Sequence, residues 1–353
     1  MWLSDLRLVL PDRVVESGAL RIEDGRIEEI REGIAPSNAI NLRGLTAIPG
    51  IIDLHGDMLE RDIEPRPRAE FPVEMAIHEL DKRLVGTGIT TAYAAVGFAW
   101  HSNDLRGQEK AVEIIRVVND MRDVLLADFK VHARFEVNNP ETVPILTDLL
   151  ERKQIDLVSI MDHKPGQGQY SDANRYIQFL TEWIGFTEDE VEPIADRIKQ
   201  RIAELKEAER DWSVVRDVLR VAREHHIVIA SHDDDTVQKV HDQAEMGVTI
   251  SEFPVTLEAA YAARERGLHV IMGAPNAFRG GSNTGNLSAL EAIQAGVVDI
   301  LATDYFPAAP LQAAFKLAHN RILPLHESVK SVSYTHLRAH ETKANLVCRL
   351  LLE

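Results

Sequence analysis

The stretch 49–57, PGIIDLHGD, is a short apolar run that ends in two polar residues, His55 and Asp57. Seven similar runs follow it: GITTAYAAVG (88–97), KVHARFEV (130–137), DLVSIMDH (156–163), HIVIASHD (226–233), GVTISEFP (247–254), HVIMGAPN (269–276) and DILATDYF (299–306). The segments between these runs carry apolar residues at helical spacing. Eight strands that alternate with helices are typical of a parallel α/β barrel, so we predict a (β/α)₈ TIM-like barrel over residues 49–330.

The two ends of the chain have a different pattern. Residues 1–48 contain short strand-like runs with a hairpin signal at Asp24-Gly25, and they predict a small β-sandwich module. Residues 331–353, SVSYTHLRAHETKANLVCRLLLE, depart from the composition of the rest. They resemble a non-native tail that recurs at the ends of unrelated metagenome-derived sequences. We expect no function there, and we do not interpret His336 and His340 as a metal-binding pair.

The composition excludes several classes of protein. The 353 residues carry a formal net charge of −17, which disfavours binding to nucleic acid or to an anionic membrane. No apolar run is long enough to span a bilayer, and the N-terminus lacks the pattern of a signal peptide, so we expect a cytoplasmic protein. Cys348 is the only cysteine, so a metal ion would be held by nitrogen and oxygen ligands.

Polar side chains that could bind a metal ion stand at the ends of several predicted strands. These are His55, Asp57, Glu136, His163, His232 and Asp304. Because the carboxyl ends of all strands in a parallel barrel share one face, these side chains are expected to converge. Imidazoles and carboxylates suit Zn²⁺ or Mn²⁺, and a bridging carboxylate would accommodate two ions. The sequence therefore predicts a centre of two divalent ions at this face.

Two other catalytic arrangements fit the sequence less well. A serine hydrolase would need a G-x-S-x-G elbow, which is absent, and Ser231 stands within a strand end rather than on a strand-to-helix turn. A glycosidase could use paired carboxylates at barrel strand ends, but it would leave the histidines unexplained.

Loops after the strands carry groups that suit an anionic ligand. Arginine can bind a phosphate bidentately, and glycines allow backbone N–H groups to approach it closely. The candidate substrate-binding residues are Arg61 and Arg66 after the first strand, Lys164 and Gln167 after the fourth, and Arg279, Gly280, Gly281, Ser282 and Asn286 after the seventh. The long insertion 164–211 is expected to shape a substrate lid. Together these loops favour a polyanionic substrate.

The motifs also resemble a known family. IPGIIDLH resembles the entry motif of the amidohydrolase superfamily, although the usual His-x-His is replaced by His55-Gly56-Asp57. This departure is similar to the PhnM diphosphatase family, as are HGDMLER, MDHKPGQGQY, ASHDDDT, EFPVTLEAA, MGAPNAFRGGSNTGN and DILATDYFP. These motifs span roughly residues 49–310 in the expected order.

The resemblance implies a reaction and a set of roles. It implies hydrolysis of α-D-ribose 1-methylphosphonate 5-triphosphate to the 5-phosphate and pyrophosphate, within phosphonate degradation by the carbon–phosphorus lyase pathway. It implies that Glu136 is the bridging carboxylate and that Asp304 both binds metal and accepts a proton from the attacking water. It also implies that the small β-sandwich module lacks its C-terminal half.

Two alternatives remain open at this point. The first is a cyclic-amide hydrolase or deaminase on the same metal scaffold, which would not need the arginine-rich and glycine-rich loops. The second is an inactive relative that serves as an assembly subunit, which six candidate ligands disfavour. Whether the chain forms a homo-oligomer is also left open by the sequence.

Overall fold

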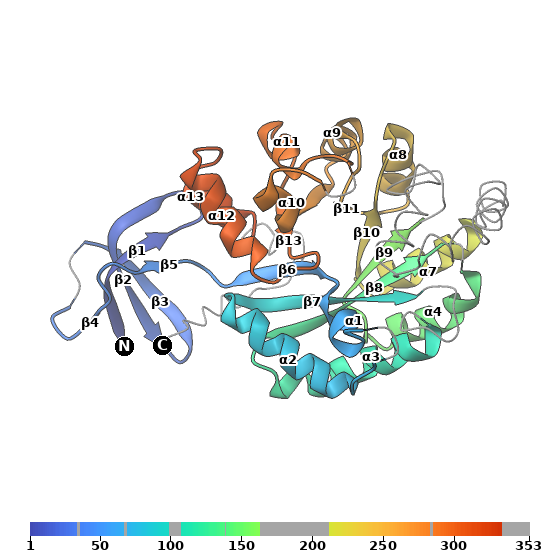
Figure 1. Cartoon of the computed structure of the whole chain (residues 1–353), viewed down its shortest axis with the longest axis horizontal. Coiled ribbons are helices and arrows are strands. Elements are labelled where there is room, and N and C mark those ends of the chain that lie inside the picture. Colours follow the sequence, from blue (N-terminus) through green and yellow to red (C-terminus); the bar gives the residue numbers. More distant parts are fainter. Residues whose placement is uncertain are drawn as a thin grey trace.

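The described part of this computed structural model, residues 1–33, 36–66, 69–98, 107–137, 139–162, 212–282 and 285–333, contains two separate sheets. Figure 1 shows the smaller, N-terminal sheet in blue beside a larger barrel. The predicted candidates His163, Lys164 and Gln167 and the predicted lid 164–211 lie outside the described residues.

The N-terminal sheet has five strands, β1 (Trp2–Val9), β2 (Val14–Glu23), β3 (Arg26–Glu32), β4 (Ile40–Asn41) and β5 (Thr46–Ala47). The order is β3-β2-β1-β4, and β5 also pairs with β1. Asp24 and Gly25 both have positive φ angles in the β2–β3 turn, which is the geometry that favours this dipeptide in tight hairpins. The sheet has its own apolar core, built from Leu3, Leu6, Leu8, Val15 and Leu20.

The barrel contains all eight predicted strands. They are β6 (Ile51–Gly56), β7 (Ile89–Phe98), β8 (Asp128–Glu136), β9 (Leu157–Met161), β10 (Val228–His232), β11 (Ile250–Glu252), β12 (His269–Gly273) and β13 (Ile300–Ala302). Neighbours in the sequence are neighbours in the sheet and run parallel. The predicted α/β barrel with a separate N-terminal β module is therefore confirmed.

Helices cover the outside of the barrel. In chain order they are α1 (Met58–Ile63), α2 (Val73–Gly86), α3 (Gln108–Met121), α4 (Val143–Glu151), α7 (Trp212–Glu224), α8 (Val237–Glu245), α9 (Leu257–Glu265), α10 (Ala274–Arg279), α11 (Ala289–Gln294), α12 (Ala309–His319) and α13 (Leu325–Lys330). Short 3₁₀ turns at Arg122–Val124 and Pro140–Thr142 flank β8. Among the described residues, no helix combines the length and the apolar character that crossing a bilayer requires.

Two apolar layers hold the barrel together. On β8, the outward-facing Val131, Ala133 and Phe135 belong to the large core between strands and helices. A smaller cluster fills the inside of the barrel, with Leu54, Tyr93, Leu157, Ala230, Ile250, Ile271, Ile300 and Ala302. Successive side chains along a strand point alternately outward, towards the helices, and inward, into the barrel, and so form the two layers.

The first and last strands meet through residues near the predicted site. The backbone N–H of Asp304 donates to the carbonyl of His55 (2.9 Å), and the N–H of Asp57 donates to the carbonyl of Asp304 (2.7 Å). One level below, the buried carboxylate of Asp53 accepts hydrogen bonds from the backbone N–H (2.8 Å) and the hydroxyl (2.5 Å) of Thr303. These bonds close the barrel between β6 and β13.

The chain after α13 continues into the barrel. Ser331 accepts a hydrogen bond from the N–H of Leu301 (2.8 Å), and Val332 accepts one from Ile52 (3.0 Å). Val332 is fully buried. The first three residues of the predicted tail therefore pack against the barrel, whereas 334–353 lie outside the described residues.

We predict that Thr303→Val lowers the free energy of unfolding by about 1–3 kcal/mol, because it removes a donor from a buried carboxylate while keeping the side-chain volume. The measurement is urea unfolding followed by circular dichroism. Thr87→Val, at the half-buried end of α2, is the matched control and should have a smaller effect. Equal stability of Thr303→Val and the unmodified protein would contradict this role of Asp53.

Candidate metal centre

The geometry at the end of β6 brings His55 into the barrel. The pairing of β6 with β7 has a register irregularity between Asp53 and Gly56. As a result, two consecutive residues both face inward: Leu54 packs in the inner apolar cluster, and His55 lies beside His232 and Glu252 above it. Such irregularities commonly re-aim a side chain next to an active site.

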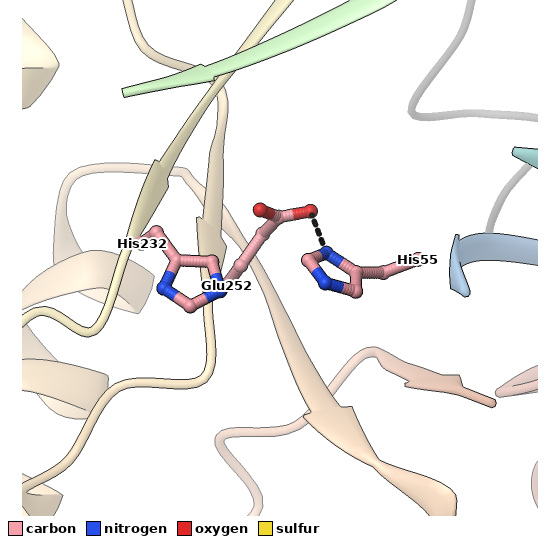
Figure 2. A group of neighbouring side chains, drawn as sticks. All are labelled: His55, His232 and Glu252. Carbon is pink, nitrogen blue, oxygen red and sulfur yellow. Dashed lines mark hydrogen bonds and ion pairs between the residues drawn. The ribbon is translucent and has the colours of Figure 1, made fainter. Parts of the chain in front are cut away.

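Three buried side chains from three strands form a group with metal-binding chemistry. One ligand atom each from His55, His232 and Glu252 lies within 4.8 Å of the other two. Figure 2 shows the Glu252 carboxylate between the two imidazole rings, with its Oε1 atom 3.2 Å from Nδ1 of His55. His232 and Glu252 are direct register partners on β10 and β11, which explains why they lie at the same level.

Two further residues enclose this group. His132 on β8 is buried, with its ring 4.9 Å from that of His55 and its Nε2 atom 2.7 Å from the hydroxyl of Ser159. Phe253 packs edge-on against both histidines. Its ring centre lies 4.8 Å from that of His55 and 5.4 Å from that of His232. The rings of the site are therefore held by packing as well as by polar contacts.

The charges in the group depend on one another. Burial alone would raise the pKa of Glu252, but the histidines around it, with His55 in direct contact, outweigh burial and lower the pKa to about 2. Burial opposes charge on His55 too, yet Glu252 and Asp57 raise its pKa to about 10. Burial dominates for His132 and lowers its pKa to about 3. Glu252 is thus an anion paired with His55, and His132 is neutral.

This donor set suits a divalent metal ion. Two imidazole nitrogens and one carboxylate oxygen are ligands that Zn²⁺ and Mn²⁺ accept. The Oε2 atom of Glu252 is buried and accepts no hydrogen bond from any described residue. A buried carboxylate oxygen without a donor is costly, and a cation would satisfy it.

Asp57 and Asp304 lie next to the group rather than within it. Asp57 Oδ1 is 2.8 Å from Nη1 of Arg134 and 3.5 Å from Nε2 of His55. Asp304 follows β13 and has a positive φ of 56°, an uncommon angle for a residue other than glycine. Burial, reinforced by Asp57, raises the pKa of Asp304 to about 7. An acid with this pKa can exchange a proton near neutral pH.

Glu136, expected to bridge two ions, ends β8 and is buried. It is not a member of the compact group formed by His55, His232 and Glu252 in the described part of the chain. Its role as a bridging ligand stays a prediction, as does that of His163.

The predicted anion-binding residues gather in part around Tyr305, which follows Asp304. Arg61 on α1 lies with its guanidinium carbon 6.0 Å from the centre of the Tyr305 ring. Arg279 at the end of α10 donates from Nη1 to the Tyr305 hydroxyl at 3.5 Å. Gly280 ends α10 with a left-handed φ of 84°, and Gly281 and Ser282 follow. Arg66 is exposed in the turn after α1, and Asn286 is half-buried before α11.

Sequence reasoning missed three residues of the centre: Glu252, His132 and Arg134. The strand-end rule that selected His232 applies equally to Glu252, the last residue of β11. On β8, His132, Arg134 and Glu136 alternate with apolar residues, and this period of two places all three on one side of the strand. That side faces the inside of the barrel.

Comparisons with known proteins agree with this architecture. No family model matches the sequence. The α-D-ribose 1-methylphosphonate 5-triphosphate diphosphatase of Escherichia coli (strain K12) is 34% identical over 342 residues, which cover 94% of this chain and 88% of that protein.

Solved structures share the fold at lower identity. An N-acetyl-D-glucosamine-6-phosphate deacetylase from Mycobacterium smegmatis matches with a TM-score of 0.64 and 16% identity, covering 99% of this chain and 93% of that one. A Xaa-Pro dipeptidase with bound methionine matches with a TM-score of 0.63 and 13% identity, covering 96% and 88%. The extent and identity of the match to the diphosphatase decide the family: the chain is a hydrolase that belongs to the family of α-D-ribose 1-methylphosphonate 5-triphosphate diphosphatases.

Proposed function

We propose that this chain is a metal-dependent diphosphatase that hydrolyses α-D-ribose 1-methylphosphonate 5-triphosphate to the 5-phosphate and pyrophosphate, in phosphonate degradation. The observation that carries the proposal is the buried group of His55, His232 and Glu252 at the carboxyl ends of three barrel strands. It stands in a chain that is 34% identical to a diphosphatase named for this substrate.

In this proposal His55, His232 and Glu252 hold the divalent ion, Zn²⁺ or Mn²⁺. A bound divalent ion lowers the pKa of water from about 16 to about 7 and so supplies hydroxide at neutral pH. The sequence predicts two ions.

Asp304 is the proposed proton acceptor for the attacking water. Its raised pKa, about 7, allows it to take a proton from water and release it again near neutral pH. Its backbone is fixed by the hydrogen bonds to His55 and Asp57 that close the barrel. The position of the carboxylate therefore depends on the fold rather than on a mobile loop.

Arg61 and Arg279 are the proposed contacts for the triphosphate. Both guanidinium groups approach Tyr305, the neighbour of Asp304, from short helices that follow different strands, α1 after β6 and α10 after β12. Among the described residues Arg279 makes no ion pair with an acidic side chain, and its charge is therefore available to an anion. Arginine neutralises the charge that accumulates on phosphoryl oxygens during transfer. Cyclic-amide hydrolysis would have no use for this charge.

The reaction can be tested by incubating the metal-loaded protein with the ribose 1-methylphosphonate triphosphate and following products by phosphorus NMR. Pyrophosphate should form in equal amount to the 5-phosphate, and His232→Ala should abolish it. Release of inorganic phosphate instead of pyrophosphate would reject the diphosphatase reaction. Turnover of a cyclic amide, with none of the triphosphate, would favour the alternative function.

We expect Arg279→Gln to lower kcat/KM for the triphosphate by roughly tenfold or more, because a charged contact to the phosphates is lost. Arg266→Gln is the matched control, since Arg266 is also exposed but lies at the far end of α9. Steady-state kinetics with the triphosphate give kcat/KM for both variants. Equal losses in the two variants would argue for a general effect of net charge.

Metal affinity should rise with pH. Glu252 and Asp57 keep His55 protonated up to a pKa of about 10, and a metal ion can bind only after that proton leaves. With one proton released per ion, affinity should increase about tenfold per pH unit between pH 6 and 9. Competition with a chromophoric chelator at several pH values measures this slope. Glu252→Gln should weaken binding strongly, and affinity independent of pH would contradict the assignment of His55 as a ligand.

A further inference from the structure

Arg134 is a buried cation in the middle of the site. It lies on β8, only 6% of it is exposed, and its Nη1 atom donates to Oδ1 of Asp57 at 2.8 Å. Its Nε atom donates to the sulfur of Met161 at 3.2 Å. A guanidinium stays charged at all physiological pH values, and burying it is unfavourable unless anions surround it. Its position therefore calls for a function.

Asp57 contacts this guanidinium, and three further carboxylates favour its charge. Burial would lower the pKa of Arg134, but Asp57, Glu60, Glu252 and Glu136 all raise it, and the net shift is upward. Asp57 and Glu136 are two of the residues that the sequence interpretation assigned as metal ligands. Their negative charges are thus already balanced, in part, by a positive charge that belongs to the protein.

We propose that the Arg134 guanidinium takes the place of a second divalent ion, so that the centre binds a single ion on His55, His232 and Glu252. The inference rests on the proposed metal centre and concerns how many ions it holds. Asp57 remains paired with Arg134 and does not bind metal. A second dication beside the guanidinium would meet a fixed like charge in a site shielded from water, where such repulsion is strong. Arg134 is a positioning residue that acts through Asp57.

Metal content tests this directly, without substrate. The protein is equilibrated with excess Zn²⁺, and unbound ions are removed by gel filtration. The bound zinc is then measured by inductively coupled plasma mass spectrometry. The unmodified protein should retain one equivalent. Arg134→Gln should retain a second equivalent, because Asp57 and Glu136 lose their counter-charge. Arg134→Lys is the matched control that keeps the charge, and it should retain one.

Two equivalents in the unmodified protein would overturn the proposal, and so would one equivalent in folded Arg134→Gln. If Arg134→Gln does not fold, electron paramagnetic resonance of the Co²⁺-loaded unmodified protein decides. A single high-spin Co²⁺ should give a full-intensity signal, whereas a magnetically coupled pair would show two ions and reject the inference. Failure of the diphosphatase reaction would leave these measurements unaffected. Glu252→Gln should lose the single ion, and it therefore tests where the ion binds separately from how many ions bind.

Discussion

The structure depends on keeping a carboxylate charged where water does not reach it. Glu252 is 0% exposed, and an isolated carboxylate in such a place would be too costly to ionise. His55 compensates its charge directly, because its Nδ1 atom lies 3.2 Å from Oε1 of Glu252. This constraint explains why the upper layer of the barrel contains a connected group of polar side chains directly above an apolar layer. Each member of the group would be unfavourable without the others.

The alternation of apolar runs with amphipathic helices was sufficient to predict the barrel. Buried parallel strands are largely apolar on both faces, and most of the eight runs show this, whereas on β8 the polar His132, Arg134 and Glu136 alternate with apolar residues. The separate N-terminal sheet was also predicted from a local pattern, because Asp24-Gly25 suits a hairpin turn with positive φ angles. Both features could be predicted because they depend on short stretches of sequence.

The composition of the site was harder to predict because it depends on register. His55 and His232 stand out as histidines at strand ends, and the structure brings them together. Glu252 also ends a strand, but β11 has only three residues and Phe-Pro follows it. Only the pairing of β10 with β11 shows that it stands opposite His232. Arg134 could not be chosen from the sequence, because its contact with Asp57 joins residues 77 positions apart.

The bonds that close the barrel have an evolutionary consequence. The backbone of Asp304 is hydrogen-bonded to His55 and Asp57, so two residues proposed for the chemistry, His55 and Asp304, also close the barrel. In many proteins a catalytic residue can be lost while the scaffold persists and acquires another role. Here a lineage that shifts the backbone at this seam would lose structural integrity, whereas the exposed Arg61 and Arg279 can change without disturbing the barrel. Divergence in this fold should therefore alter which molecule is recognised long before it alters how a bond is broken.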